Sequence, residues 1–388
     1  ELKKIFNLYN LKEFSTTEIE NSPMFSRNVS ELSALVNKEI DSYEDKNKKN
    51  ISLRREGTAG IIRSIIQKKL DISSHKLWYI GQMWRYERPQ KGRFRQFTQA
   101  GVEILGNEEG TSEFEMISIV TSIVNKFKLK NYVIKINHLG NKKTKDSYCT
   151  ALKKFLENFK DNIHSSDLEK LEKNPLRILD SKDANLQKIL QEGPSIKEFI
   201  SDSANELLLE LQTTFSNSCK LEIDYNLVRG LDYYTGLVFE ASSADLGAQD
   251  AFIGGGRYDN LSSMLGGKNL PAIGLAIGLE RLISISSPNK ADEKKVIFIT
   301  STSNIAPLAF KIANQLRSLN SSVALDMDLT DSSLKAKLRR ANKTNASHAL
   351  ILGDKEIDSK NIIIKSLMDD TEQVSVSIEE CLDFYNKI

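Results

Sequence analysis

The sequence predicts an α+β protein, in which a strand-rich domain with a helical insertion is followed by a smaller α/β domain. Two segments near residue 90 have the aromatic and β-branched content of paired strands. A central block is helical in pattern and almost free of glycine, and the last part of the chain alternates strand and helix. The expected boundaries are 1–140 and 220–288 for the strand-rich domain, 141–219 for the insertion and 294–388 for the C-terminal domain.

The first elements are a helix and a strand-to-helix turn. An amphipathic pattern predicts a helix over residues 1–14. The apolar positions that would face a core or a partner are Leu2, Ile5, Phe6 and Leu8. The segment ISLRREGTAG (Ile51–Gly60) predicts a short strand and then a helix to about Leu70, with Thr58 as the N-cap. The carboxylate of Glu56 stands at this turn, free to meet a ligand amine.

Two strands are then expected over Leu77–Glu87 and Phe97–Leu105, joined by the cationic loop RPQKGRFRQ. Side chains alternate along a strand, so Arg85 shares a face with Tyr79 and Glu87. The return strand would present Gln99, a bare backbone at Gly101, and Glu103 on one face, and Val102 and Ile104 toward a core.

Arginine is the informative residue of this hairpin, because its planar fork binds phosphate bidentately. The chain has 39 lysines and only 15 arginines, but seven of those arginines lie within Arg54–Arg95. The hairpin therefore suits a small polar molecule that bears phosphates. The alternative is an exposed hairpin whose charges are merely solvated.

The elements after the hairpin are expected to serve packing. Apolar residues at helical spacing predict a helix over Gly110–Phe127, and Tyr132–Ile136 alternates as a strand. The block Asn141–Cys219 is rich in charged residues and leucine, is periodic as helices, and contains only Gly193 among the glycines. A solvated helical appendage without function is the alternative to a functional insertion.

Glycine marks a second candidate part of the site, since ten of the twenty glycines fall in Gly230–Gly278. LEIDYNLVRGLDYYTGLVFEA (Leu221–Ala241) predicts two strands joined by a turn. The turn offers Arg229, Tyr233 and Tyr234, a set suited to grip a flat polar side chain, although a tyrosine-rich turn can also be packing.

Two further glycine-containing segments follow this turn. In IGGGRYDNL (Ile253–Leu261) three glycines let the backbone approach a ligand, although they could also form only a bulge. PAIGLAIGLERL (Pro271–Leu282) is expected to run from strand to helix through Gly274 and Gly278. Small residues there would admit an adenine ring, and Arg281 would stack on it or meet the γ-phosphate.

The segment Ser284–Glu293 has the composition of a linker. Beyond it, strands and helices alternate as in a small α/β domain. A basic helix is expected over Ser333–Asn345, with Lys335, Lys337, Arg339, Arg340 and Lys343. This run is either a solvated face or a nucleic-acid patch.

Composition limits the class of protein. The net charge is only +2, so any nucleic-acid contact must come from local patches. There is no run of 18 apolar residues and no apolar secretion signal at the start of the sequence. Three scattered cysteines, Cys149, Cys219 and Cys381, argue for a reducing compartment, the cytosol by default. Four isolated histidines make no pair at metal-ligand spacing, so we expect no protein metal site.

The motifs resemble a known family. RYERPQKGRFRQF resembles motif 2 of the class II aminoacyl-tRNA synthetases in the form found in histidyl-tRNA synthetases. LRREGTAG, LVRGLDYYTG, IGGGRYDNL and the motif 3-like PAIGLAIGLERL follow the same family and arrive in its order. NPLRILDSKD (Asn174–Asp183) resembles part of the insertion that closes over the tRNA acceptor end. The sequence departs from the family at Arg55 and Thr17, where prolines are usual.

The resemblance implies a class II antiparallel-sheet catalytic domain and a C-terminal anticodon-binding domain. The implied activity is formation of histidyl-adenylate from L-histidine and ATP with Mg²⁺, then transfer to tRNA(His), in a cytoplasmic homodimer. Arg229 and Arg85 would be the catalytic residues. The implied histidine-binding residues are Glu56, Thr58, Gln99, Glu103, Arg229, Tyr233, Tyr234 and Tyr258; the implied ATP-binding residues are Arg85, Glu87, Arg93 and Arg281.

Two other functions fit the same resemblance. One is a non-catalytic paralogue that acts as the regulatory subunit of an ATP phosphoribosyltransferase in histidine biosynthesis; such paralogues lose parts of the histidine signatures and the C-terminal domain. The other is an RNA-sensing module fused to a kinase. This sequence keeps both signatures and the C-terminal pattern, and it contains no kinase segment.

Overall fold

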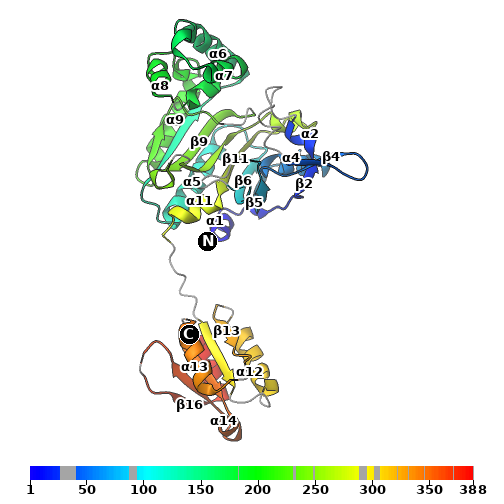
Figure 1. The fold of residues 1–388 in the computed structure, drawn as a ribbon, viewed down its shortest axis with the longest axis vertical. Coiled ribbons are helices and arrows are strands. Elements are labelled where there is room, and N and C mark those ends of the chain that lie inside the picture. Colours follow the sequence, from blue (N-terminus) through cyan, green and yellow to red (C-terminus); the bar gives the residue numbers. More distant parts are fainter. Residues whose placement is uncertain are drawn as a thin grey trace. The chain divides into compact units, whose positions relative to one another are not determined.

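The computed structural model describes most of the 388 residues. The described ranges are 1–26, 41–86, 94–181, 183–229, 233–247, 250–287, 295–300, 306–320, 322–330, 332–344, 346–369 and 371–387. The chain forms two compact units, Glu1–Ser287 and Pro288–Ile388 (Figure 1). No helix within these ranges is long and apolar enough to cross a membrane. All three cysteines are free thiols, as their wide spacing predicts.

The first unit is built on one mixed sheet of eight strands in the order β1-β5-β6-β11-β10-β9-β7-β8. The strands are β1 Lys12–Glu13, β5 His75–Trp84, β6 Gln96–Leu105, β7 Tyr132–His138, β8 Leu221–Ile223, β9 Thr235–Ser243, β10 Ala251–Arg257 and β11 Ala272–Gly278. From β5 to β7 every neighbouring pair is antiparallel, and only the short strands β1 and β8 pair in parallel. The expected antiparallel sheet is therefore confirmed.

The hairpin β5–β6 has the register that its alternation predicts. Tyr79 lies opposite Gly101 and Gly81 lies opposite Gln99. Val102 and Ile104 are buried on the far face, where the core lies. The first strand ends at Trp84, so its predicted extension through Arg85 and Tyr86 is wrong, and Glu87 lies outside the described residues.

The N-terminal helix is shorter than predicted. It spans α1 Leu2–Leu8, and Asn10, two residues beyond its end, has a left-handed φ of 53° that is incompatible with a continuing helix. Residues 12 and 13 form β1 instead, so the predicted helix over residues 1–14 is wrong in its second half. Leu8 is 83% exposed and does not join the core of this chain, whereas Phe6 packs on Trp78 with ring centroids 5.5 Å apart.

Two helices, α5 and α4, contribute apolar side chains to the core of the first unit. α5 (Thr111–Lys126) matches the predicted helix, and Glu113 caps it by accepting a hydrogen bond from the Gly110 backbone N–H at 2.7 Å. α4 (Thr58–Gln67) buries Ile61, Ile62 and Ile65. Neighbouring short elements are α2 Ser22–Ser26 and a separate sheet of β2 Ile19–Asn21, β4 Asn50–Leu53 and β3 Ser42–Glu44, of which only β4 was expected.

The predicted pairing within Leu221–Ala241 is wrong. β8 and β9 are not neighbours, because β7 lies between them and pairs with both. The tyrosine segment is therefore the end of a connection that crosses β7, not a hairpin turn. Three more short elements belong to this region: η4 Ala244–Leu246, α10 Leu261–Met264 and α11 Leu279–Ile285.

The glycine-poor block forms helices, which gather at one side of the first unit beyond the sheet (Figure 1). They are α6 Lys142–Glu157, η1 Lys160–Asn162, α7 Ser165–Lys173, η2 Pro175–Asp180, α8 Ala184–Gln191, η3 Ile196–Glu198 and α9 Asp202–Phe215. Side-chain oxygens of Asn141, Asp183 and Ser201 accept the first orphan amides of α6, α8 and α9.

The second unit is an α/β domain with a five-stranded sheet in the order β13-β12-β14-β15-β16. The strands are β12 Lys295–Thr300, β13 Ala324–Met327, β14 His348–Leu352, β15 Asn361–Ser366 and β16 Val374–Ser377; the helices are α12 Ala306–Leu319, α13 Leu334–Lys343, α14 Asp354–Asp358 and α15 Ile378–Lys387. The alternation was predicted, but β16 and α15 were not. The core includes Phe298, Leu316 and Tyr385.

Candidate active site

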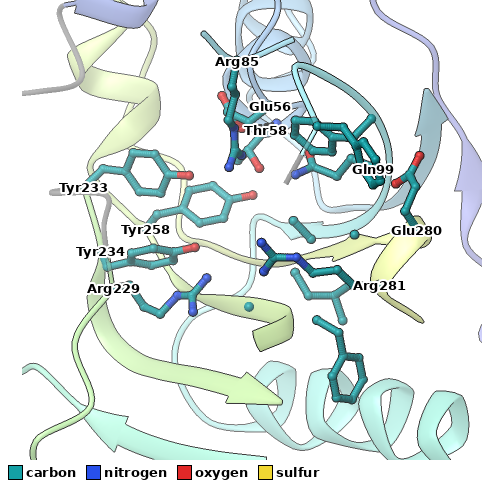
Figure 2. A pocket seen from close by; sticks show the side chains of 18 residues that line it. Glu56, Thr58, Arg85, Gln99, Arg229, Tyr233, Tyr234, Tyr258, Glu280 and Arg281 are labelled. Atoms are coloured by element: carbon teal, nitrogen blue, oxygen red, sulfur yellow. Dashed lines mark hydrogen bonds between the residues drawn. The ribbon is translucent and has the colours of Figure 1, made fainter. Parts of the chain in front are cut away.

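A pocket with a cavity volume of about 180 Å³ lies over the centre of the eight-stranded sheet and opens to solvent. Its lining comes from β6, β10, β11, the start of α4, the start of α11 and the segment before β9. Figure 2 shows these side chains. They are Glu56, Thr58, Arg85, Phe94, Phe97, Gln99, Arg229, Tyr233, Tyr234, Phe252, Gly254, Tyr258, Gly274, Leu275, Ala276, Gly278, Glu280 and Arg281.

Small residues in register across the sheet make the floor of the pocket. Gly254 of β10 pairs with Ala276 of β11, which pairs with Gly101 of β6. Directly opposed residues of antiparallel strands share a face, so this row offers almost no side-chain volume on the pocket side. At the β5 end the row closes on Tyr79, whose ring occupies the space over both Gly57 and Gly101. The backbone at Gly101, predicted to be bare, is thus covered by Tyr79, so only Gly254 and Ala276 of this row line the pocket.

The first turn of α4 is organised by the Glu56 carboxylate. One carboxylate oxygen accepts the Thr58 N–H at 2.6 Å and the other accepts the Ala59 N–H at 3.0 Å. Glu56 therefore caps the helix with its side chain and Gly57 is the N-cap residue, so the prediction that Thr58 is the N-cap is wrong. Burial raises the pKa of Glu56, and the two backbone N–H groups oppose that shift.

Glu103 is fully buried beneath the pocket rather than in its lining. It accepts hydrogen bonds from the Thr58 hydroxyl at 2.7 Å and from the Tyr258 hydroxyl. Gly274 lies opposite it on β11, and a Cβ there would stand 1.8 Å from a Glu103 carboxylate oxygen. Burial raises the pKa of Glu103 to about 8, although the two hydroxyl donors lower it. Glu103 thus orients Thr58 and Tyr258 from below.

The amide of Gln99 is fixed with one end turned to the protein. Its carbonyl oxygen accepts the Gly57 N–H at 3.2 Å and the Tyr79 hydroxyl at 3.0 Å. This leaves the NH₂ end of the amide as the group available to a ligand. The predicted face of Gln99 and Glu103 is therefore confirmed, with Gln99 in the pocket wall and Glu103 behind it.

Three buried tyrosines form one wall of the pocket (Figure 2). The ring centroids of Tyr233 and Tyr234 are 5.0 Å apart, and those of Tyr233 and Tyr258 are 5.7 Å apart in an edge-to-face arrangement. Burial raises the pKa of all three phenols, so they remain neutral hydroxyls at neutral pH. Lys145 of α6 donates to the Tyr234 backbone carbonyl at 2.7 Å, which ties the helical block to this wall.

Three guanidinium groups enter the pocket from different elements. Arg85 follows β5, donates to the Arg55 carbonyl at 3.1 Å and lies 5.0 Å over the Phe97 ring. Arg281 of α11 donates to the Ala251 carbonyl at 2.6 Å. Arg229 forms an ion pair with Glu240 of β9. Guanidinium groups are suited to bind phosphate oxygens bidentately, so the pocket offers donors for a phosphate-bearing ligand.

The carboxylate of Glu280 lines the same pocket. Glu280 is the second residue of α11, and its carboxylate accepts the Thr98 backbone N–H at 2.7 Å. No group of three or more His, Cys, Asp or Glu side chains in the described ranges has the geometry to hold a metal ion by itself. His138 hydrogen bonds Glu109 at 2.8 Å, and neither residue lines the pocket.

The structure brings together most of the residues that the motifs single out. Glu56, Thr58, Arg85, Gln99, Arg229, Tyr233, Tyr234, Tyr258 and Arg281 all line the pocket. The predicted ATP-binding residues Glu87 and Arg93 lie outside the described residues. The sequence analysis missed Phe94, Phe97, Phe252 and Glu280 in the lining, and Glu240, which pairs with Arg229. Phe252 could have been found from the sequence. It lies two residues before Gly254, and residues two apart on a strand share a face.

Comparison with known proteins now gives the family. The model of the family described as "Histidyl-tRNA synthetase" matches residues 31–282, well over half of the chain. The chain belongs to the histidyl-tRNA synthetase family. A second family model, described as "Anticodon binding domain", matches residues 294–388.

Relatives of the family match along the whole chain. The histidine–tRNA ligase of Francisella tularensis subsp. holarctica (strain OSU18) is 37% identical over 100% of this chain and 94% of its own length. The apo histidyl-tRNA synthetase of S. aureus has a TM-score of 0.77 at 27% identity, covering 99% of this chain and 93% of its own. An ATP phosphoribosyltransferase regulatory subunit/histidyl-tRNA synthetase from Bacillus halodurans C shares the fold, with a TM-score of 0.61 at 21% identity over 91% of this chain and 92% of its own. The α+β class II architecture is thus confirmed.

Proposed function

We propose that this chain is a histidine–tRNA ligase, which activates L-histidine with ATP to histidyl-adenylate and transfers it to tRNA(His). The observation that carries the proposal is that Arg85, Arg229 and Arg281 line one pocket together with three buried tyrosines, Tyr233, Tyr234 and Tyr258. The cations suit the triphosphate and the tyrosines suit a flat polar ring.

Histidine would lie between α4 and the tyrosine wall. Its α-amino group would meet the Glu56 carboxylate and the Thr58 hydroxyl. The imidazole would lie against Tyr233, Tyr234 and Tyr258. Glu103 would act from beneath, because its carboxylate sets the direction of both the Thr58 and Tyr258 hydroxyls. A site built of buried polar partners can reject analogues that lack the ring nitrogens by about 10⁴-fold or more.

ATP would lie on the arginine side of the pocket. Arg85 and Arg229 would neutralise charge on the α-phosphate, and Arg281 would bind the nucleotide from α11. The rings of Phe94, Phe97 and Phe252 give this part of the pocket apolar walls that suit adenine. Glu87 and Arg93 are proposed as further ATP contacts from the sequence resemblance alone.

The chemistry needs no covalent enzyme intermediate. A histidine carboxylate oxygen attacks the α-phosphorus, and the bond to pyrophosphate breaks. A ribose hydroxyl at the tRNA 3′ end then attacks the histidyl carbonyl and releases AMP. Arg229 and Arg85 contribute by holding both reactants and by stabilising developing charge.

Magnesium is proposed to arrive with the nucleotide. Mg²⁺ usually keeps several waters and binds one or two carboxylates together with substrate phosphates. Glu280 fits such a role, because its carboxylate lines the pocket beside Arg281. Bound there, the ion would neutralise phosphate charge.

Two segments are proposed to contact tRNA: the 141–219 insertion at the acceptor end and the 294–388 domain at the anticodon. In the 294–388 domain, two of the cations predicted on the basic helix already have partners within the protein and so cannot readily bind phosphate. Lys337 is buried and donates to the Thr300 carbonyl at 2.9 Å, and Arg340 pairs with Asp328 at 2.8 Å. The exposed cations of α13 are Lys335, Arg339 and Lys343, so these are the proposed phosphate contacts.

The regulatory-subunit alternative is not favoured. Matches to histidine–tRNA ligases extend through the C-terminal domain, whereas the likeness to the regulatory subunit/histidyl-tRNA synthetase rests on the fold alone. Assembly as a homodimer and a cytosolic location remain proposals from the family resemblance.

Histidine-dependent exchange of labelled pyrophosphate into ATP, without tRNA, tests the proposal. Exchange with histidine alone among the amino acids, strongly reduced in Arg229→Ala, is expected. A well-folded wild-type protein that binds ATP and catalyses no exchange would rule out adenylate formation and favour the regulatory role.

A further inference from the structure

One acidic side chain at the edge of the pocket is explained by none of the roles above. Glu240 lies on β9, directly opposite Gly254 of β10 in the row of small residues that floors the pocket. Its carboxylate forms an ion pair with Nη1 of Arg229. Glu240 thus binds one edge of the guanidinium proposed to act on the α-phosphate.

The path of the Arg229 side chain depends on this contact and on the absence of a side chain at Gly254. A Cβ at residue 254 would stand 1.8 Å from Nη2 of Arg229 and 2.4 Å from Cζ, so the guanidinium lies directly across the bare strand. Nε of Arg229 is buried and has no hydrogen-bond partner within the described ranges. Since an arginine side chain has many rotamers of similar energy, one anchored edge is what selects this orientation.

The lysine next to Glu240 does not compete with Arg229 for its carboxylate. The residue opposite Glu240 on β7 is Lys135, whose ammonium would be the competing partner. Lys135 instead donates to Asp224 at 2.8 Å. Burial raises the pKa of Glu240, and the nearby Arg229 is the strongest opposing influence. Both side chains are only 23% exposed, so screening by water is incomplete.

We propose that Glu240 is a positioning residue, which anchors Nη1 of Arg229 over Gly254 and turns the remaining N–H donors toward the α-phosphate. The inference rests on the proposed function, because it assumes that Arg229 acts on that phosphate. It predicts that the loss of Glu240 lowers the rate of adenylate formation more than it weakens binding.

The test compares Glu240→Gln with Glu240→Asp and with Glu222→Gln in the full chain. Glu222 is a matched control, since it is a glutamate of the same sheet that pairs with Lys220 at 3.4 Å away from the pocket. Each variant is assayed for kcat and KM in histidine-dependent pyrophosphate exchange, and for its unfolding midpoint. Glu240→Gln should lower kcat about 10- to 100-fold with KM values within about 3-fold of wild type, because misplacement of a catalytic group costs rate.

The charge-retaining Glu240→Asp should recover part of that rate, and Glu222→Gln should match wild type. In an Arg229→Ala background, Glu240→Gln should cause no further loss, because the anchored group is gone.

Three results would overturn the inference: a kcat for Glu240→Gln within 2-fold of wild type, a higher kcat, or a loss that is equally large in the Arg229→Ala background. A wild-type protein without exchange would refute the proposed function instead.

Discussion

The substitution Gly254→Ala tests the position of the Arg229 guanidinium directly, because it adds a single methyl group beside it. In Gly254→Ala the new Cβ would lie 1.8 Å from Nη2 of Arg229, 2.4 Å from Cζ and 2.8 Å from Nη1. Ordinary van der Waals contact begins near 3.4 Å, so Nη2 must retreat by at least the difference, 1.6 Å. The displaced group is the far end of a flexible side chain, so the strands beneath it need not move.

The expected result is a loss of activity without a loss of fold. A misplacement of about 1 Å can cost roughly 100-fold in rate, so we expect kcat for histidine-dependent pyrophosphate exchange to fall about 100-fold or more. The unfolding midpoint in urea should change little, since no backbone contact is disturbed. Exchange kinetics and urea unfolding on the same preparation measure both quantities.

The neighbouring glycine supplies the matched control with the opposite outcome. A Cβ at Gly255 would lie 2.3 Å from the Gly274 carbonyl oxygen and 2.4 Å from the Phe239 ring, which are fixed parts of the core. Gly255→Ala should therefore destabilise the fold strongly. If Gly254→Ala kept wild-type exchange, or lost stability as Gly255→Ala does, the placement of Arg229 across the strand would be wrong.

Three further predictions concern other groups. Burial holds the pKa of Glu103 at about 8, so the folded state binds more protons than the unfolded chain above about pH 4.5. Its contribution to stability must therefore fall as pH rises from 5 to 8. Glu103→Gln should remove a fall of about 4 kcal/mol, seen in urea unfolding across that range. Lys145→Met removes the donor to the Tyr234 carbonyl and should raise KM for histidine about 3- to 10-fold in exchange assays. Lys337→Met leaves the Thr300 carbonyl buried without its ammonium partner and should destabilise the C-terminal unit by about 1–3 kcal/mol in urea unfolding.

Each of these has a result that would contradict it. A stability difference between wild type and Glu103→Gln that is constant with pH would show that Glu103 does not titrate in this window. Lys143 is an exposed neighbour on α6, so Lys143→Met should leave KM for histidine unchanged, and equal effects of the two lysines would argue against the backbone contact. For Lys337, the comparison is Lys335→Met on the exposed face of α13; equal stability of the two variants would refute the buried role.

Local pattern was enough to predict much of the catalytic sheet. Alternation in Leu77–Glu87 and Phe97–Leu105 predicts the strands β5 and β6 and their faces, because the side-chain period of a strand is fixed at two, although β5 ends earlier, at Trp84. The same reasoning places Gln99 and Glu103 on one side. The same reasoning failed for Leu221–Ala241. The local pattern cannot show that β7 (Tyr132–His138), which is distant in sequence, lies between β8 and β9 in the sheet.

The sequence by itself determined the family, the order of the motifs and nine of the residues that line the pocket, because chemistry of this kind requires particular residue types at particular spacings. Only the tertiary structure decided which contacts those residues make. It put Glu103 beneath the pocket, covered Gly101 with Tyr79, and set Glu240 against Arg229 across Gly254. Such contacts depend on strand register between segments distant in sequence, and register is a property of the assembled sheet.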